Sequence, residues 1–126
     1  MSDKGAADAR RRRAERSGRR AEFLASAAYI LRGYQIIDRR FRAPQGEIDL
    51  IVRRGRLIAF VEVKLRADVD AAILAVTPAG RRRLERAAGN FLSLRPQFVE
   101  FAVRYDIAAV AGWRVFILAD AWRAEN

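Results

Sequence analysis

Two alternating segments joined by one tight turn constrain the fold of this chain more than any other feature. Residues 47–53 and 56–65 alternate their side chains between two faces, which is typical of strands with a buried face. Only Arg54 and Gly55 lie between them, and a two-residue loop joins antiparallel neighbours in a sheet. The sequence therefore predicts a β-hairpin whose register is fixed by this loop.

The alternation predicts one apolar face and one face that carries charges. The apolar face is expected to contain Ile48, Leu50, Val52, Leu57, Ala59, Val61, Val63 and Leu65. On the other face, the two-residue loop places Glu47 across from Glu62, and Asp49 on the diagonal from Glu62. Lys64 and Phe60 flank Glu62 on this face, so we expect the face to be covered rather than open to water. An odd-length loop would shift the register and scatter these side chains.

Three carboxylates gathered on one sheet face destabilise it unless a counter-charge is present. Lys64 supplies one positive charge, and a divalent cation would supply the rest. Carboxylates together with water molecules are the ligands that Mg²⁺ prefers. We therefore expect Mg²⁺ or Mn²⁺ at this cluster. The alternative is a polar face whose charges form ordinary cross-strand pairs.

The composition restricts the chemistry and indicates a polyanionic partner. The 126 residues include no histidine and no cysteine, which excludes imidazole acid–base catalysis, thiol nucleophiles and zinc–thiolate sites. Any catalysis must use carboxylates, lysine, arginine, hydroxyls or a hard metal ion. The net charge of +10 favours a polyanion but does not distinguish DNA from RNA or an acidic protein. Lys4 and Lys64 are the only lysines, and the second lies within a strand.

The rest of the chain predicts one α/β domain over residues 14–126, preceded by a basic leader. We expect residues 1–13 to be disordered; the alternative is an arm that neutralises phosphates. The expected elements are helices over 14–32 and 78–91, strands over 34–41, 47–53, 56–65, 101–110 and 113–118, a loop over 66–75 and a helical tail over 119–123. This αβββαββ order predicts a mixed sheet flanked by helices. With neither an apolar run long enough to span a membrane nor a secretory signal, we expect a cytoplasmic protein without a membrane partner.

The hairpin strings GEIDLI at residues 46–51 and FVEVK at residues 60–64 resemble a known signature. It is the D-x(n)-E-x-K pattern of the restriction-endonuclease-like, or PD-(D/E)xK, nuclease superfamily. More closely, the chain resembles the YraN family, small bacterial proteins of that fold. The likeness covers nearly the whole chain beyond Arg16, including Glu22 in the first helix and residues 76–78 at the start of the second.

This resemblance implies a metal-dependent endonuclease that hydrolyses DNA, including branched or flapped DNA. Asp49 and Glu62 would hold the metal together with the Val63 carbonyl. Lys64 would position the attacking water, and Glu22 would add a carboxylate from the first helix. Because branched DNA is cut at two places, we also expect a homodimer.

Further residues are expected around this site. Ser26, four residues after Glu22, and Glu47 would support the metal-binding groups. The expected nucleic-acid contacts are Arg53, Arg54, Arg81 and Arg82. Asp106 is expected to be structural, in a salt bridge.

One departure from the family pattern leaves other functions open. Gly80 and Arg81 stand where members of the family usually carry Lys-Gln. One alternative is a non-catalytic nucleic-acid-binding module that keeps the nuclease fold. Another is an adaptor that binds an acidic protein through the basic leader.

Overall fold

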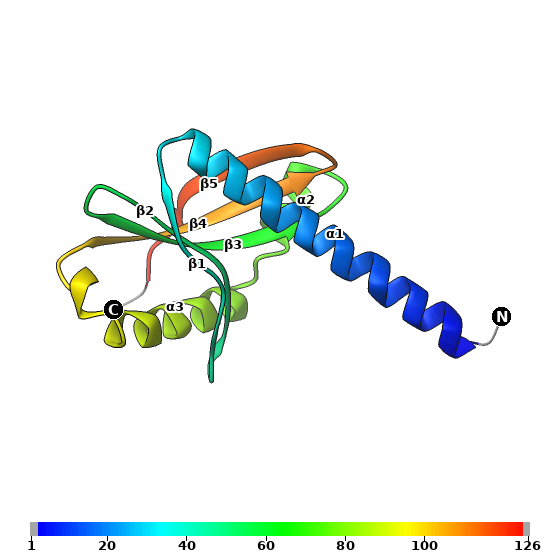
Figure 1. Cartoon of the computed structure of the whole chain (residues 1–126), viewed down its shortest axis with the longest axis horizontal. Helices are drawn as coiled ribbons and strands as arrows, with labels where there is room; N and C mark the ends of the chain where they lie inside the picture. The colour runs from blue at the N-terminus through cyan, green and yellow to red at the C-terminus, as the bar shows by residue number, and fades with distance from the viewer. Residues whose placement is uncertain (1–2, 125–126) are drawn as a thin grey trace.

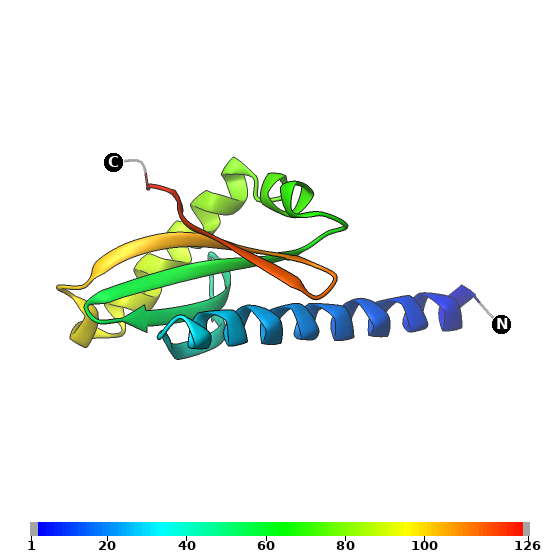
Figure 2. The same cartoon turned by 90° about the horizontal axis from the view of Figure 1, so that it is seen from above.

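The computed structural model describes residues 3–124 and shows a five-stranded mixed sheet with helices on both faces (Figures 1 and 2). The strands are β1 (Gln35–Ala43), β2 (Gly46–Arg54), β3 (Leu57–Leu65), β4 (Ala102–Ala111) and β5 (Arg114–Trp122), arranged in that order. The β3–β4 pair is parallel and the other three pairs are antiparallel. The predicted α/β class with a mixed sheet is therefore confirmed.

The parallel pair requires a crossover connection, which the segment between β3 and β4 provides. This segment contains α2 (Val69–Leu74), α3 (Pro78–Ser93) and a short 3₁₀ turn (Pro96–Phe98). Thr77 caps α3, because its hydroxyl accepts a hydrogen bond from the Gly80 N–H at 3.1 Å. This cap fixes the residue at which α3 begins.

Each face of the sheet is covered by one helix, and each helix has its own apolar cluster. Ala25 and Tyr29 of α1 (Asp3–Leu31) pack against the face formed by Leu50, Val52, Ala59 and Val61. On the opposite face, Leu84, Ala87, Ala88 and Phe91 of α3 pack against Ile51, Ile58 and Phe60. The two faces of the hairpin therefore differ as the alternation predicted, except at Ile48, which packs with the α3 cluster rather than with Leu50.

The hairpin register differs from the prediction by two residues. Arg54 pairs with Leu57 and Leu50 with Val61, so the loop consists of Gly55 and Arg56. Gly55 has a φ of 60°. Both common two-residue hairpin turns require a positive φ at their first loop position. A shift of two residues keeps the same side chains on each face. It nevertheless overturns the predicted pairing of Glu47 with Glu62.

The first helix is longer than the sequence predicted. Residues 3–13, expected to be disordered, continue α1, whereas residues 1 and 2 lie outside the described residues. Alanine and arginine, both strong helix formers, dominate this stretch. Figure 2 shows the N-terminal part of α1 projecting beyond the sheet, and the first buried residue of the described helix is Ala21.

Two other segments also differ from the prediction. The expected loop over 66–75 contains α2, whose N-cap Asp68 accepts a hydrogen bond from the Ala71 N–H at 2.8 Å. The expected helical tail belongs to β5, because pairing with β4 continues to Trp122 across a register shift. No helix within residues 3–124 is both long and apolar enough to cross a membrane.

Candidate active site

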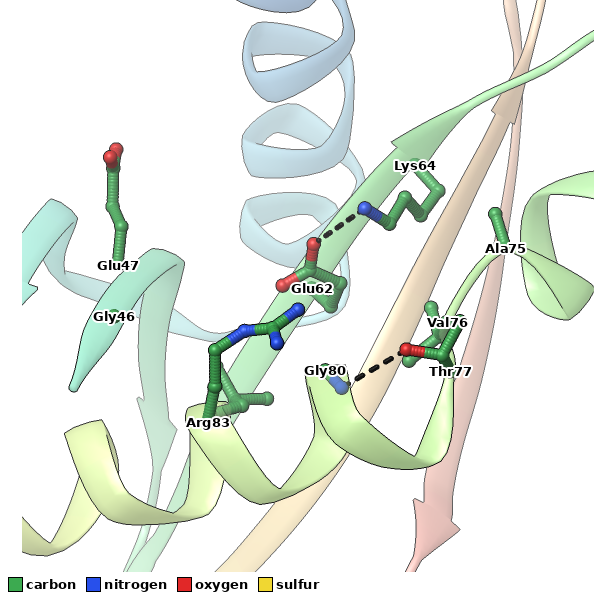
Figure 3. A pocket seen from close by; sticks show the side chains of 10 residues that line it. Gly46, Glu47, Glu62, Lys64, Ala75, Val76, Thr77, Gly80 and Arg83 are labelled. Carbon is green, nitrogen blue, oxygen red and sulfur yellow. Dashed lines mark hydrogen bonds and ion pairs between the residues drawn. The ribbon is translucent and has the colours of Figure 1, made fainter.

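A small cavity lies where the end of β3 meets the start of β2 and the first turns of α3. It encloses about 150 Å³, which is room for several water molecules. Its lining includes acidic, basic and hydroxyl side chains (Figure 3). The lining residues are Gly46, Glu47, Glu62, Lys64, Ala75, Val76, Thr77, Gly80, Arg83 and Leu84.

Asp49 is joined to this cavity through the backbone of β3. Its Oδ2 accepts a hydrogen bond from the Val63 N–H at 2.8 Å. Val63 lies between Glu62 and Lys64, and the Lys64 Nζ is 3.1 Å from the Glu62 Oε1. The structure therefore brings Asp49, Glu62 and Lys64 together, as the hairpin pattern predicted.

The electrostatics of Asp49 reflect this environment. Burial, and then the negative charge of Glu62, raise the pKa of Asp49 to about 7. The charge of Glu22 acts in the same direction, whereas the Val63 N–H and Lys64 oppose the rise. When Asp49 is ionised, the two carboxylates carry more negative charge than Lys64 balances, and a bound cation would stabilise them.

The donor chemistry of this site fits a hard divalent ion. Asp49 and Glu62 are the carboxylates that could hold it, and one or two carboxylates with waters are sufficient for Mg²⁺. No group of three or more acidic residues in the described part of the chain is placed to hold a metal by itself. An ion would therefore complete its shell with water or substrate oxygens. Val63, expected to contribute its carbonyl, uses its N–H to hold Asp49.

Glu22 and Glu47 are each paired with an arginine. The Nε–H of Arg40 in β1 donates a hydrogen bond to the Oε2 of Glu22 in α1, at 2.7 Å. Glu47 is half-exposed and lies 3.7 Å from Arg42, and Figure 3 shows its carboxylate away from Glu62 and Lys64. The charge of Glu22 therefore acts on Asp49. Glu47 lies on the rim of the cavity. Ser26 is buried, and its hydroxyl has no hydrogen-bond partner among the described residues.

The arginines predicted to bind nucleic acid do not line the cavity. Arg53 and Arg54 lie at the opposite end of β2 from Asp49, stacked over Phe101 and Tyr34. Arg81 stacks over Trp122, with its guanidinium carbon 5.2 Å from the ring centroid.

Arg82 and Arg83 are both exposed on α3, but of the two only Arg83 lines the cavity. Arg83 was missed, although the sequence held a signal for it. It is three residues from Gly80, and residues three apart on a helix are neighbours.

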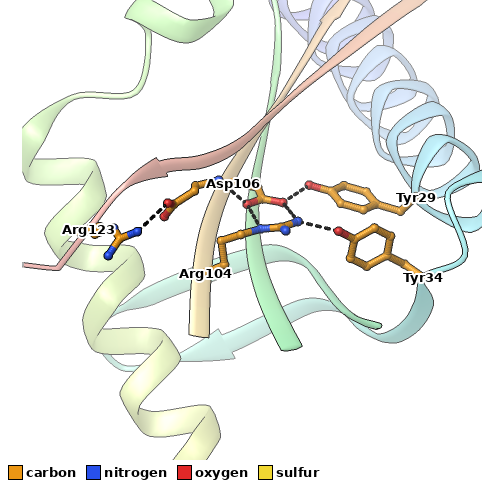
Figure 4. A network of polar contacts seen from close by, with 6 residues as sticks. Tyr29, Tyr34, Arg104, Asp106 and Arg123 are labelled. Atoms are coloured by element: carbon orange, nitrogen blue, oxygen red, sulfur yellow. Dashed lines mark hydrogen bonds and ion pairs between the residues drawn. The ribbon is translucent and has the colours of Figure 1, made fainter. Parts of the chain in front are cut away.

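A second polar cluster supports the site from within the fold. Asp106 of β4 is fully buried and pairs with Arg104 at 2.8 Å, as its predicted structural role requires. The Tyr29 hydroxyl of α1 donates to Asp106 at 2.7 Å, and Arg104 donates to the Tyr34 hydroxyl at 2.8 Å (Figure 4). Burial and the Asp106 charge raise the pKa of Tyr29, so its proton stays in this bond. The network ties α1, and hence Glu22, to the sheet.

These features define a small mixed α/β domain with a carboxylate pair and a lysine at the end of a hairpin. The chain belongs to the uncharacterised protein family UPF0102, which it matches over residues 21–110 and which is the YraN family of the sequence analysis. The match includes Glu22, Asp49, Glu62 and Lys64 but not the projecting part of α1.

Close relatives cover most of the chain. A UPF0102 protein of Parvibaculum lavamentivorans is 49% identical over 111 residues, which are 87% of this chain and 84% of the relative. The UPF0102 protein amb4503 of Paramagnetospirillum magneticum is 45% identical over 117 residues, 89% of this chain and 91% of the relative.

Proposed function

We propose that this protein is a metal-dependent nuclease of restriction-endonuclease-like fold that hydrolyses phosphodiester bonds of DNA in the cytoplasm. The observation that carries the proposal is the hydrogen bond from the Val63 N–H to Asp49. It holds one carboxylate beside a second carboxylate and a lysine, next to a cavity open to substrate. This set suits phosphodiester hydrolysis in a chain without histidine or cysteine.

Each residue of the set has a defined task. Asp49 and Glu62 would hold Mg²⁺ or Mn²⁺, which when bound stabilises negative charge on the scissile phosphate. Lys64 donates hydrogen bonds to the attacking water and is itself held by Glu62. Glu22 adds negative charge from α1, and Arg40 fixes its position.

The basic surface supports a nucleic-acid substrate. The chain carries a net charge of +10, and residues 10–16 of α1, five of which are arginine, are all exposed. The projecting part of α1 extends beyond the sheet (Figure 1). It therefore offers a helical arm of positive charge that can neutralise phosphates outside the cavity.

A homodimer belongs to the same proposal, because one domain supplies one Asp49–Glu62–Lys64 set. Phe23, Ile30 and Leu31 of α1 are large apolar side chains that the described fold leaves exposed.

A second candidate function is a non-catalytic nucleic-acid-binding module. Two observations favour it. Within residues 3–124 no three acidic residues are grouped to hold a metal. Gly80 also presents no side chain to the cavity, and Arg81 stacks on Trp122 rather than entering it. Such a module would bind DNA with a steep salt dependence and show no metal-dependent turnover.

A cleavage panel distinguishes the two functions. Wild type, Asp49→Asn and Lys64→Ala are incubated with labelled single-stranded, duplex, flap and four-way DNA, in Mn²⁺ or in EDTA. We expect wild type to cleave at least one substrate in Mn²⁺ only, and both variants to lose at least about 100-fold in rate while still binding DNA. Binding by wild type without cleavage of any substrate would favour the non-catalytic module.

A further inference from the structure

We infer that Arg83 is a phosphate-binding residue of this cavity, and that its guanidinium occupies the space that Gly80 leaves free. The inference rests on the proposed nucleic-acid substrate and names a side chain that would contact its backbone. It concerns binding of the phosphate rather than the hydrolytic step.

The position of Gly80 explains how Arg83 reaches the cavity. Both residues lie on α3, three positions apart, and both line the cavity. A Cβ atom at position 80 would lie 3.7 Å from the Arg83 Nη2 and 3.3 Å from the Thr77 Oγ1. A longer side chain at position 80 would therefore compete with the guanidinium for the same volume. Figure 3 shows Arg83 extending from α3 towards Glu62 and over Gly80.

The stem of Arg83 is held by the start of β2. A Cβ atom at Gly46 would lie 3.6 Å from the Arg83 Cβ, so the two backbones approach closely at this point. Gly46 also lines the cavity. The base of the side chain thus lies against the start of β2, and its guanidinium lies beside Gly80.

The charge of Arg83 is available for an anion. Among the described residues, Arg40, Arg42, Arg56, Arg104 and Arg123 each form an ion pair with a carboxylate. Arg83 forms none in residues 3–124. Lys64, the other cation of the cavity, is already paired with Glu62. Arg83 is therefore the cation of the cavity lining whose charge is not already paired.

A DNA phosphodiester matches this arrangement in charge and geometry. The guanidinium presents several N–H donors in one plane and can bind two oxygens of one phosphate group. Its neighbour in the cavity is the Glu62–Lys64 pair. A phosphate bound by Arg83 would thus lie next to the residues assigned to hydrolysis.

The test measures DNA binding and cleavage separately. Binding of a fluorescein-labelled DNA duplex is followed by anisotropy in EDTA at several salt concentrations, and cleavage is measured in Mn²⁺. The variants are Arg83→Ala, Arg83→Lys and the double variant Gly80→Lys with Arg83→Ala. Arg86→Ala is the matched control, because it removes the same charge from another exposed position of α3 that does not line the cavity. Circular dichroism confirms that each variant is folded.

We expect Arg83→Ala to weaken DNA binding about tenfold. It should also reduce the slope of log affinity against log salt by about 1, the value for one phosphate contact. Arg83→Lys should retain part of the affinity. The double variant should recover most of it, because a lysine at position 80 places a positive charge in the vacated volume. Arg86→Ala should change binding less than about threefold.

Equal binding by Arg83→Ala and Arg86→Ala would overturn the inference, as would a change in Tm without a change in the salt slope. Wild type that binds DNA through Arg83 but cleaves no substrate would support the inference and contradict the nuclease proposal. If wild type cleaves DNA and Arg83→Ala binds and cleaves as well as wild type, the nuclease proposal is supported and the inference about Arg83 is contradicted.

Discussion

The carboxylate of Asp49 accepts a hydrogen bond from the backbone N–H of Val63, at 2.8 Å, beyond the last paired residues of β2 and β3. In this contact a side-chain carboxylate, rather than a backbone carbonyl of the neighbouring strand, accepts the hydrogen bond from the Val63 N–H. It also brings an acidic group beside Glu62 and Lys64, where burial and like charge oppose its ionisation. The same residue therefore joins the strands and creates an electrostatic strain that a bound cation would relieve.

The raised pKa of Asp49 predicts a pH-dependent effect on stability. Because the pKa is about 7 in the folded protein and 3.8 without these interactions, folding favours the protonated form. This contribution is fully present below about pH 4 and is lost as the pH rises through about 7. Asp49→Asn cannot ionise and keeps an oxygen for the Val63 N–H. In EDTA at pH 8, we expect it to raise the free energy of unfolding by about 1–3 kcal/mol.

Urea unfolding at pH 8 and pH 4 checks this effect. The difference between Asp49→Asn and wild type should shrink towards zero at pH 4, where both side chains are neutral. A variant that is less stable than wild type at both pH values would show that the charge of Asp49 does not oppose folding.

Binding of Mn²⁺ should stabilise the fold through Asp49 and Glu62. A ligand at about 100 times its Kd adds about 2.7 kcal/mol to the free energy of unfolding. We expect Mn²⁺ to raise the Tm of wild type, and to raise it more at pH 8 than at pH 6, because protons compete for Asp49. Thermal unfolding of wild type, Asp49→Asn and Glu62→Gln checks this, with the shift absent in both variants. An equal shift in all three proteins would place the ion elsewhere.

The buried network around Asp106 should contribute strongly to stability. Asp106→Ala leaves Arg104 and the Tyr29 hydroxyl without their acceptor. We expect a loss of about 3–5 kcal/mol, since removal of one partner leaves a charge unpaired in a largely buried place. The control is Glu100→Ala, which breaks the exposed Arg56–Glu100 pair and should cost less than about 1 kcal/mol. Comparable losses in the two variants, measured by urea unfolding, would contradict a special role for Asp106.

The projecting part of α1 should act in DNA binding without supporting the core. We expect replacement of Arg10, Arg11, Arg12 and Arg13 by alanine to reduce the slope of log affinity against log salt by about 2–4. The same four positions changed to lysine should keep most of the slope, and Tm should stay unchanged in both. Fluorescence anisotropy over a salt series measures this. An unchanged slope in the alanine variant would exclude the arm from the interface.

The sequence was sufficient to predict which hairpin side chains share a face, but not how they pair. Strand side chains alternate with a period of two, so Glu62 and Lys64 share a face of β3 whether the loop is at residues 54–55 or 55–56. Asp49 joins them through the hydrogen bond from the Val63 N–H, although Ile48 breaks the alternation of β2. Glu47 is sensitive to the register, and it lies beside Arg42 rather than across from Glu62. The sequence signal for the correct register was Gly55 itself, because glycine readily adopts the positive φ that the first loop position requires.

The contacts between distant segments could not be predicted from local patterns. Glu22 and Arg40 belong to different elements, and nothing in the sequence distinguishes Arg40 from Arg39 as the partner. On α3, the core stripe from Leu84 to Phe91 fixes the rotation of the helix. This rotation turns Arg83 to the cavity, whereas Arg81, the residue predicted from the family pattern, stacks on Trp122.

Comparison of Glu62→Gln with Glu47→Gln tests the proposed nuclease most directly. Both glutamates line the same cavity, yet Glu62 is beside Asp49 and Lys64, whereas Glu47 is paired with Arg42 on the rim. In single-turnover cleavage of the best substrate from the panel in Mn²⁺, we expect Glu62→Gln to lose at least about 100-fold in rate and Glu47→Gln less than about fivefold. Equal rates for wild type and Glu62→Gln, or no metal-dependent cleavage by wild type, would contradict the assignment.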